Sequence, residues 1–324
     1  LINYCGALLI SYCLKMYQVI TIGSALVDIF VHTHKFEVMD TAKGVLLCQM
    51  HGGKTEVDNF NVYTGGGGGN TAVGFARLGF DTAVMCETGR DNFSYLVVKD
   101  LEDQGVATSL IISEKKEQTG GSVILICENG ERSVLVHRGA AAMLDPFDIS
   151  AYWISESSWV HLASIGGREK TLQKVFSSVA RSSSTRLSWN PGKIELMMLA
   201  EKKISVDDVP CEIFLVNEDE WQMIETIQPQ VLSSFSYVVV TAGKRGGDVY
   251  FQKEHVCHFS ALSTQVTDTT GAGDSFATGF VAGILWGKTP QEAAIFGARN
   301  SASVVGYYGA KTGLLSKEKI MENE

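Results

Sequence analysis

Residues 268–274, which read DTTGAGD, combine groups that bind phosphate with an acid that can accept a proton. An alternating run over 257–266 predicts a strand before this stretch, and apolar residues at helical spacing follow Asp274. A glycine-rich turn between a strand and a helix directs backbone N–H groups and a helix N-terminus at one point, where anions are stabilised. Asp274 then either caps the helix or acts as a base toward the bound anion. The stretch predicts phosphate chemistry, with a capped tight turn as the alternative.

A second glycine-rich stretch, 65–69, is followed by Asn70 and by a helical pattern over 71–78. Five successive glycines let a backbone approach a compact polar ligand closely, and Asn70 adds an amide for hydroxyl groups. Asp28 comes shortly after a buried strand predicted over 17–22. An acid at that end of an α/β sheet lies where such proteins bind ligands, although a solvated loop acid is the alternative.

Two further predicted strand ends carry polar groups. Asn217 is followed by the acids 218–220, which suit Mg²⁺ because that ion prefers oxygen ligands and keeps several waters. The alternative is an acidic first turn of a helix. Residues 241–247, which read TAGKRGG, place a hydroxyl group and two cations on a glycine-rich strand end. That combination suits a polyphosphate, with a plain hairpin turn as the alternative.

Two other patterns point to different nucleotide sites. A G-x-G-x-x-A pattern begins at Gly67, and Glu87 follows about twenty residues later, as in dinucleotide-dependent dehydrogenases. The preceding segment, 56–61, is however too polar for the buried first strand of that unit. Residues 53–55 resemble the end of a phosphate-binding P-loop, but Cys48 occupies the place of its first glycine. A dehydrogenase therefore remains only an alternative.

The composition limits the class of protein. The chain has 324 residues, 45% of them hydrophobic, and a formal net charge of −9. These values fit one large α/β domain, and an acidic balance without a Lys/Arg cluster argues against nucleic acid as a partner. The seven cysteines form no C-x-x-C pair. Reduced thiols and a cytoplasmic location are therefore expected.

The first residues do not fit the pattern of the rest. Residues 1–14 are apolar, but they are too short to span a membrane and lack the basic region of a signal peptide. Met16 directly precedes the first strand pattern. We predict that 1–15 are a non-native or disordered extension, that 16–324 form the folded domain, and that the protein has no membrane partner.

Strand and helix patterns alternate along most of the chain. This alternation is typical of an α/β fold with a mostly parallel sheet and helices on both faces. Two β-rich segments without helices, about 29–64 and 119–138, interrupt it and predict a small β lid; the second contains a hairpin signal at 128–130. Buried strands are expected at 82–87, 159–163, 186–189, 213–216 and 237–241, and helices at 96–103, 172–180 and 218–227.

Taken together, these motifs resemble those of the ribokinase-like (PfkB) family of carbohydrate and nucleoside kinases. Residues 268–274 match its D-T-x-G-A-G-D signature, and the glycine run ending in Asn70 matches its G-G-x-x-x-N signature. Asn217 begins an N-x-x-E motif, and Thr241 begins a T-x-G-x-x-G loop. The four motifs occur in the family's order, and the resemblance extends from Met16 to the C-terminal region.

The resemblance implies a role for each motif. Asp274 would be the general base that takes a proton from a primary hydroxyl as it attacks the γ-phosphoryl group of ATP. The backbone amides of 271–274 would form the anion hole, which suits a reaction that depends on positioning and electrostatic stabilisation. By residue, the resemblance assigns the anion hole to Gly271, Ala272 and Gly273, the acceptor to Asp28, Gly66, Gly67 and Asn70, and the nucleotide to Asn217, Glu220, Thr241, Gly243, Gly246 and Asn300.

Metal ions and a second subunit are implied in the same way. Glu220 would hold Mg²⁺ through water, and Asp268 and Thr270 would hold a monovalent cation such as K⁺. The lid would pair two chains into a homodimer. The expected function is therefore an ATP-dependent sugar kinase, with a nucleoside kinase as the alternative and a non-catalytic sugar-binding regulator as a more distant one.

Two departures limit the substrate. Gly67 stands where ribokinases carry a lysine, which removes a contact to the acceptor. The family's frequent Gly-Ala-Asn appears here as GAA over 139–141, after Arg138. Ribose itself is thus not indicated.

Overall fold

The computed structural model describes residues 17–42, 44–113, 116–127 and 132–322. The predicted extension 1–15 and the predicted hairpin turn 128–130 lie outside these residues.

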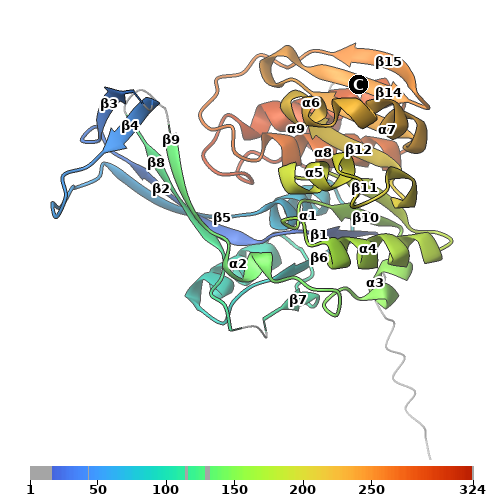
Figure 1. Ribbon diagram of the computed structural model, residues 1–324, viewed down its shortest axis with the longest axis horizontal. Helices are drawn as coiled ribbons and strands as arrows, with labels where there is room; N and C mark the ends of the chain where they lie inside the picture. Colours follow the sequence, from blue (N-terminus) through green and yellow to red (C-terminus); the bar gives the residue numbers. More distant parts are fainter. Residues whose placement is uncertain (1–16, 43, 114–115, 128–131, 323–324) are drawn as a thin grey trace, which may run out of the picture.

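A nine-stranded sheet forms the centre of the protein (Figure 1). Its order is β15-β14-β13-β12-β11-β10-β1-β6-β7. The strands from β7 to β13 pair in parallel, whereas β14 and β15 add an antiparallel edge. This confirms the mostly parallel sheet. The strands are β1 (Val19–Ile22), β6 (Thr82–Glu87), β7 (Ile111–Ile112), β10 (Trp159–Leu162), β11 (Arg186–Trp189), β12 (Ile213–Asn217), β13 (Tyr237–Thr241), β14 (Gly247–Phe251) and β15 (Glu254–Phe259).

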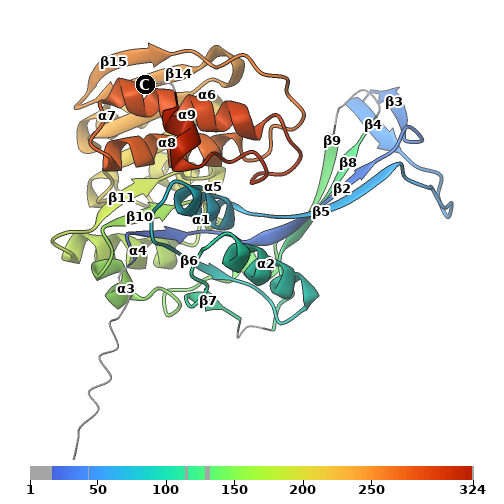
Figure 2. The same cartoon turned by 180° about the vertical axis from the view of Figure 1, so that it is seen from behind.

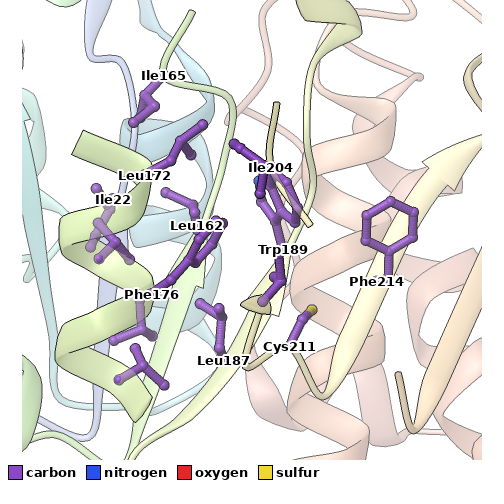
Figure 3. Packing of buried hydrophobic residues seen from close by; sticks show 14 of the residues in the cluster. Ile22, Leu162, Ile165, Leu172, Phe176, Leu187, Trp189, Ile204, Cys211 and Phe214 are labelled. Carbon is purple, nitrogen blue, oxygen red and sulfur yellow. The ribbon is translucent and has the colours of Figure 1, made fainter. Parts of the chain in front are cut away.

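Helices cover both faces of this sheet (Figure 2). One face packs on α4 and α5 in a core that includes Trp189, Phe176 and Leu162 (Figure 3). The other packs on α1, α8 and α9. Successive strand residues such as Ile213 and Phe214 enter opposite cores, as expected for a sheet buried on both sides. The helices are α1 (Gly67–Arg77), α2 (Asn92–Asp103), α3 (Ala151–Ser155), α4 (Glu169–Arg181), α5 (Lys193–Ala200), α6 (Glu218–Met223), α7 (Gln228–Ser234), α8 (Ala272–Leu285), α9 (Pro290–Val304) and α10 (Lys317–Met321).

The two β-rich segments join in a separate sheet that projects from the body (Figures 1 and 2). Its order is β5-β2-β8-β9, with β2 parallel to β8 and the other pairs antiparallel. A hairpin of β3 (Glu37–Thr41) and β4 (Gly44–Cys48) lies at its far end. We call β2, β5, β8 and β9 the lid sheet: β2 (Leu26–His32), β5 (Asn59–Gly65), β8 (Gly121–Ile126) and β9 (Arg132–His137).

The strand register gives the lid sheet two distinct faces. Asp28, Tyr63 and Ser122 are register partners, so they share one face with Phe30, two positions along β2. We call this the inner face, because Phe30 packs against Tyr308 of the body. The opposite, outer face carries Ile29, Val62, Val123 and Leu135.

Several sequence-based boundaries differ from the structure, and two of them lie at the site. The strand predicted over 257–266 is β15, which ends at Phe259. The residues from 260 to 266 leave the sheet edge and line a cavity instead. The helix predicted over 71–78 begins four residues earlier, at Gly67, because glycines of the run already adopt helical backbone.

Candidate active site

The turn before α8 is built on a glycine. Gly271 is the N-cap of α8 and has a φ of +79°, in the left-handed region that favours glycine. A Cβ atom at this position would lie 2.4 Å from the Cβ of Ala310. Asp274 is therefore the third residue of the helix and not its N-cap, which corrects one of the two roles considered from sequence.

Asp274 is half-buried and hydrogen-bonded to Asn70, the residue that follows the glycine run. Asn70 Nδ2 donates to Asp274 Oδ2 over 2.7 Å. Burial raises the pKa of Asp274 to about 6, while the Asn70 hydrogen bond opposes that rise. A Cβ on Gly67 would sit 3.7 Å from Asp274 Oδ1. The glycine run thus borders the oxygen that Asn70 does not use.

Asp28 lies on the inner face of the lid sheet, at its base. Ser122 Oγ donates to Asp28 Oδ1, and a Cβ on Gly65 would lie 2.3 Å from Asp28 Oδ2. Burial raises the pKa of Asp28, against the effect of the Ser122 hydrogen bond. Gly65 and Gly67 are two positions apart, so the carboxylates of Asp28 and Asp274 flank the same short length of backbone.

An arginine of the lid sheet contacts the turn at 268–271, and the sequence alone did not reveal this contact. Arg132, the first residue of β9, donates from Nη1 to Asp268 Oδ1 at 2.6 Å and to Thr270 Oγ1 at 3.2 Å. Its Nη2 donates to Thr269 Oγ1 at 2.8 Å. The only sequence signal was a cation at the start of a lid strand, which does not reveal the acid it meets.

This contact bears on the implied monovalent cation. Asp268 Oδ1 also accepts from the backbone N–H and hydroxyl of Thr270, and Oδ2 accepts from Gly309 N. With Arg132 on Oδ1, a guanidinium supplies the positive charge at the atoms expected to hold K⁺. The donor set in this arrangement does not fit a bound monovalent cation.

A cavity of about 810 Å³ borders the turn before α8. Ala272 and Gly273 of the turn form one wall, and Thr241, Gly243 and Gly246 of the glycine loop line another part. Three of the residues predicted for the nucleotide are therefore brought to one cavity. Its apolar wall comes from Phe259, Leu262, Val266, Phe276, Ala298, Ala302 and Val305, and Lys244 adds a cation.

Asn300 does not line this cavity, although the resemblance places it near the adenine. Its side chain is fully buried; Nδ2 donates to Ser275 O and Thr278 Oγ1, and Oδ1 accepts from Leu315 N. The amide ties α8, α9 and the C-terminal segment together. Its neighbour Ser301 faces the cavity instead.

Asn217 and Glu220 form a reciprocal capping box at the start of α6. Glu220 N donates to Asn217 Oδ1 at 2.8 Å, and Asn217 N donates to Glu220 Oε2 at 2.9 Å. Burial raises the pKa of Glu220. The two residues therefore cap the first turn of α6, which is the alternative role that the sequence left open for these acids. Because Asn217 is the register partner of Thr241, the pair nevertheless lies beside the glycine loop.

Within the described part of the chain, no three His, Cys, Asp or Glu side chains are grouped so as to hold a metal ion. Among the same residues, no helix combines the length and apolarity needed to cross a membrane. Any metal at the site would therefore rely on a bound ligand's oxygens and on single protein groups such as Glu220.

Residues 16–317 match the model of the pfkB family carbohydrate kinases. An uncharacterized sugar kinase of Archaeoglobus fulgidus is 28% identical over 75% of this chain and 98% of its own.

Solved structures share the fold. A nucleoside kinase of Methanocaldococcus jannaschii has a TM-score of 0.76 and 21% identity, covering 95% of this chain and 98% of its own. A putative ribokinase II of Escherichia coli, in complex with ATP and Mg²⁺, has a TM-score of 0.78 and 19% identity over 95% and 98% of the two chains.

Proposed function

The chain belongs to the pfkB family of carbohydrate kinases, which are phosphotransferases with an alcohol acceptor, and we propose that it phosphorylates a primary hydroxyl of a sugar or nucleoside. Asp274 acts as the general base in this proposal. The observation that carries it is the position of Asp274, which is bonded to Asn70 and lies between the glycine run and the turn that walls the 810 Å³ cavity.

The transfer step follows from this placement. The acceptor hydroxyl gives its proton to Asp274 as its oxygen forms a bond to the γ-phosphorus. The bond from that phosphorus to the bridging oxygen breaks, and ADP leaves with the electron pair. Backbone amides at the start of α8, beginning with Gly271, stabilise the charge on the transferring oxygens. A carboxyl with a pKa of about 6 is ionised at pH 7 and remains basic enough to take the proton.

ATP is the proposed donor, and the cavity residues fit it. Apolar walls suit a nucleobase, whereas Lys244, Thr241 and the glycine amides suit phosphates. Glu220 uses Oε2 in the capping box, which leaves its other oxygen for a water bound to Mg²⁺. Bound to the phosphates, Mg²⁺ would neutralise part of their charge. The E. coli structure with ATP and Mg²⁺ supports this donor by likeness of fold alone.

Asp28, Gly66, Gly67 and Asn70 are proposed to bind the acceptor. A sugar needs only such polar groups. The inner face also carries Val134 and Val136, 48% and 61% exposed, and the body adds Tyr308, 40% exposed. Exposed apolar surface beside Asp28 suits a nucleobase, and this observation favours a nucleoside as the second candidate.

The lid supports a further proposal, a homodimer. Phe60, Val62 and Leu135 are 62%, 45% and 61% exposed on its outer face. A hollow of about 550 Å³ at the base of this face is lined by Ile29 and Val123 among others. Apolar surface of this kind marks an interaction site, and a second copy of the lid would cover it. A cytoplasmic location stays a prediction.

Turnover of ATP with a panel of acceptors tests the function. The purified protein is given ATP and Mg²⁺ with hexoses, pentoses or nucleosides, and ADP release is measured. We expect at least one acceptor to raise ADP release well above its rate with water alone. Binding of an acceptor without turnover would instead support the regulator, and a thermal shift with NAD but not ATP would support the dehydrogenase.

A further inference from the structure

The base of the lid contains a buried cation that the proposed reaction does not use. Lys311 is 9% exposed, and its ammonium group donates to Asp100 Oδ2 of α2 and to Thr64 Oγ1 of β5. Thr64 Oγ1 donates in turn to Asp100 Oδ2 at 2.6 Å. Burial lowers the pKa of Lys311, while Asp100 raises it. Removing one partner of such a buried ion pair is destabilising, because it leaves an uncompensated charge in the interior.

The residues just before Lys311 pack against the turn at 268–271. Gly309 N donates to Asp268 Oδ2 at 3.1 Å. Ala310 lies against Gly271, since a Cβ there would come within 2.4 Å of the Ala310 methyl group. Three consecutive residues therefore contact the start of the turn, its left-handed glycine and the lid base. We call residues 309–311 the backing segment.

The partners of Lys311 lie on the acceptor side. Thr64 directly precedes Gly65, which abuts Asp28, and the glycine run continues from there into α1. The last residue of α1, Arg77, donates from Nη1 to the carbonyl oxygens of Lys311 and Leu314, both at 2.9 Å. Thr64, just before the glycine run, and Arg77, at the end of α1, are thus both hydrogen-bonded to Lys311.

We propose that Lys311 is a positioning residue, which holds the backing segment, and with it the anion-hole turn, in fixed register with the acceptor-binding glycine run. The inference rests on the proposed kinase function. Lys311 touches neither reactant. It acts through Gly309 and Ala310 on the turn, and through Thr64 on the backbone that borders Asp28.

The consequence for the reaction is geometric. Phosphoryl transfer needs the acceptor oxygen, the phosphorus and the stabilising amides in line, and a shift of about 1 Å can cost about a hundredfold in rate. Lys311 does not line the 810 Å³ cavity, and its side-chain hydrogen bonds go to Thr64 and Asp100. Its loss is therefore expected to lower the rate of the ternary complex, whereas the affinity of either ligand alone is kept.

Lys311→Met tests this, with Lys319→Met on exposed α10 as the matched control. The assays are run well below each variant's unfolding temperature, so that a loss of stability does not enter. For Lys311→Met we expect kcat to fall about ten- to hundredfold, and the Kd of a non-hydrolysable ATP analogue to change less than about twofold. Wild-type kcat in Lys311→Met would overturn the inference, and so would an equal loss in the control.

Variants of the partners separate positioning from folding. Thr64→Val and Asp100→Asn remove the same link from its other end, so each should lower kcat, and combining either with Lys311→Met should add little. Full additivity of the losses contradicts a shared link. Lys311→Arg, which keeps the charge, should recover part of kcat.

A measurement without substrate keeps the inference separate from the proposed function. Amide hydrogen exchange over 268–275 should quicken in Lys311→Met and stay unchanged in Lys319→Met. Unchanged exchange in both variants would refute the link. If the wild type turns over no acceptor, the kinase proposal fails, and the exchange result still decides whether Lys311 holds the turn.

Discussion

The proposed donor side and the proposed acceptor side of the site are built in opposite ways. The donor cavity is lined by residues that all lie between Thr241 and Val305. The acceptor side combines Asp28, the glycine run, Ser122 and Asp274. Its central hydrogen bond, between Asn70 and Asp274, joins residues 204 positions apart.

This difference indicates where each side is vulnerable. The donor cavity is formed by one region of the chain, so its walls depend on local packing of α8 and α9. The acceptor side depends on how the lid sheet and the glycine run meet α8. We therefore expect changes at the turn to affect both sides, and changes in the lid to affect chiefly the acceptor side.

The largest effect is expected where the two sides meet. Asp274→Asn keeps the shape of the side chain but removes the base, so kcat should fall by about 10²–10⁴-fold. Affinity for an ATP analogue should stay, since the donor cavity is intact. Steady-state kinetics and calorimetry measure the two quantities, with Asp103→Asn on the surface of α2 as the control. Turnover close to wild type would remove Asp274 from its role.

A pair of glycine variants separates backbone strain from a blocked turn. Gly271 and Gly105 have nearly the same φ, +79° and +78°, but a Cβ meets Ala310 at the first and nothing within 4 Å at the second. Gly271→Ala should lower kcat by about 10²-fold or more, as expected when an anion-hole donor is displaced. Gly105→Ala should cost only about 1–2 kcal/mol of unfolding free energy. Equal losses of kcat in both variants would contradict the steric argument.

The pH dependence should follow Asp274. Because burial raises its pKa to about 6, the carboxylate is lost as the pH falls below 6. The value of kcat/KM should drop about tenfold for each pH unit below that point. Asn70→Leu removes the hydrogen bond that favours the carboxylate, so the acidic limb should move to higher pH. A limb near pH 4 in the wild type would contradict this environment.

Loss of the lid arginine should have a smaller effect. Arg132 is 39% exposed and its ion pair with Asp268 is partly screened, so Arg132→Gln should lower kcat only about five- to tenfold. The exposed Arg138, which directly follows β9, provides the control variant Arg138→Gln. An effect confined to ATP affinity would place Arg132 on the donor side and contradict the expectation that lid changes act chiefly on the acceptor side.

The smallest effect on catalysis is expected at the outer face of the lid. Phe60→Asp with Leu135→Asp places charge on the apolar surface and should convert a dimer to a monomer, with kcat/KM changed less than about threefold. Sedimentation velocity measures the assembly. Phe147→Asp, at a residue 97% exposed outside the lid, is the control. A wild-type monomer would refute the proposed homodimer.

The sequence by itself determined the alternation of strands and helices and the residues that make up each local motif. Within the DTTGAGD turn, spacing alone predicted an anion site at the start of a helix, because its backbone geometry is set by neighbouring residues. The glycine loop at Thr241 is likewise a local motif, and its residues line the 810 Å³ cavity proposed for the nucleotide.

Tertiary structure decided what distant residues do to one another. Arg132 lies 136 positions from Asp268, and nothing in the pattern of either segment specifies their contact. Asn300 matched a family position, yet packing of α8 against α9 turned its amide inward. Lys311 belongs to none of the sequence motifs, and its partners Asp100 and Thr64 lie 211 and 247 positions away in the chain. Periodicity records which face of an element is buried, but not which neighbour buries it, so these contacts arose only when the elements packed.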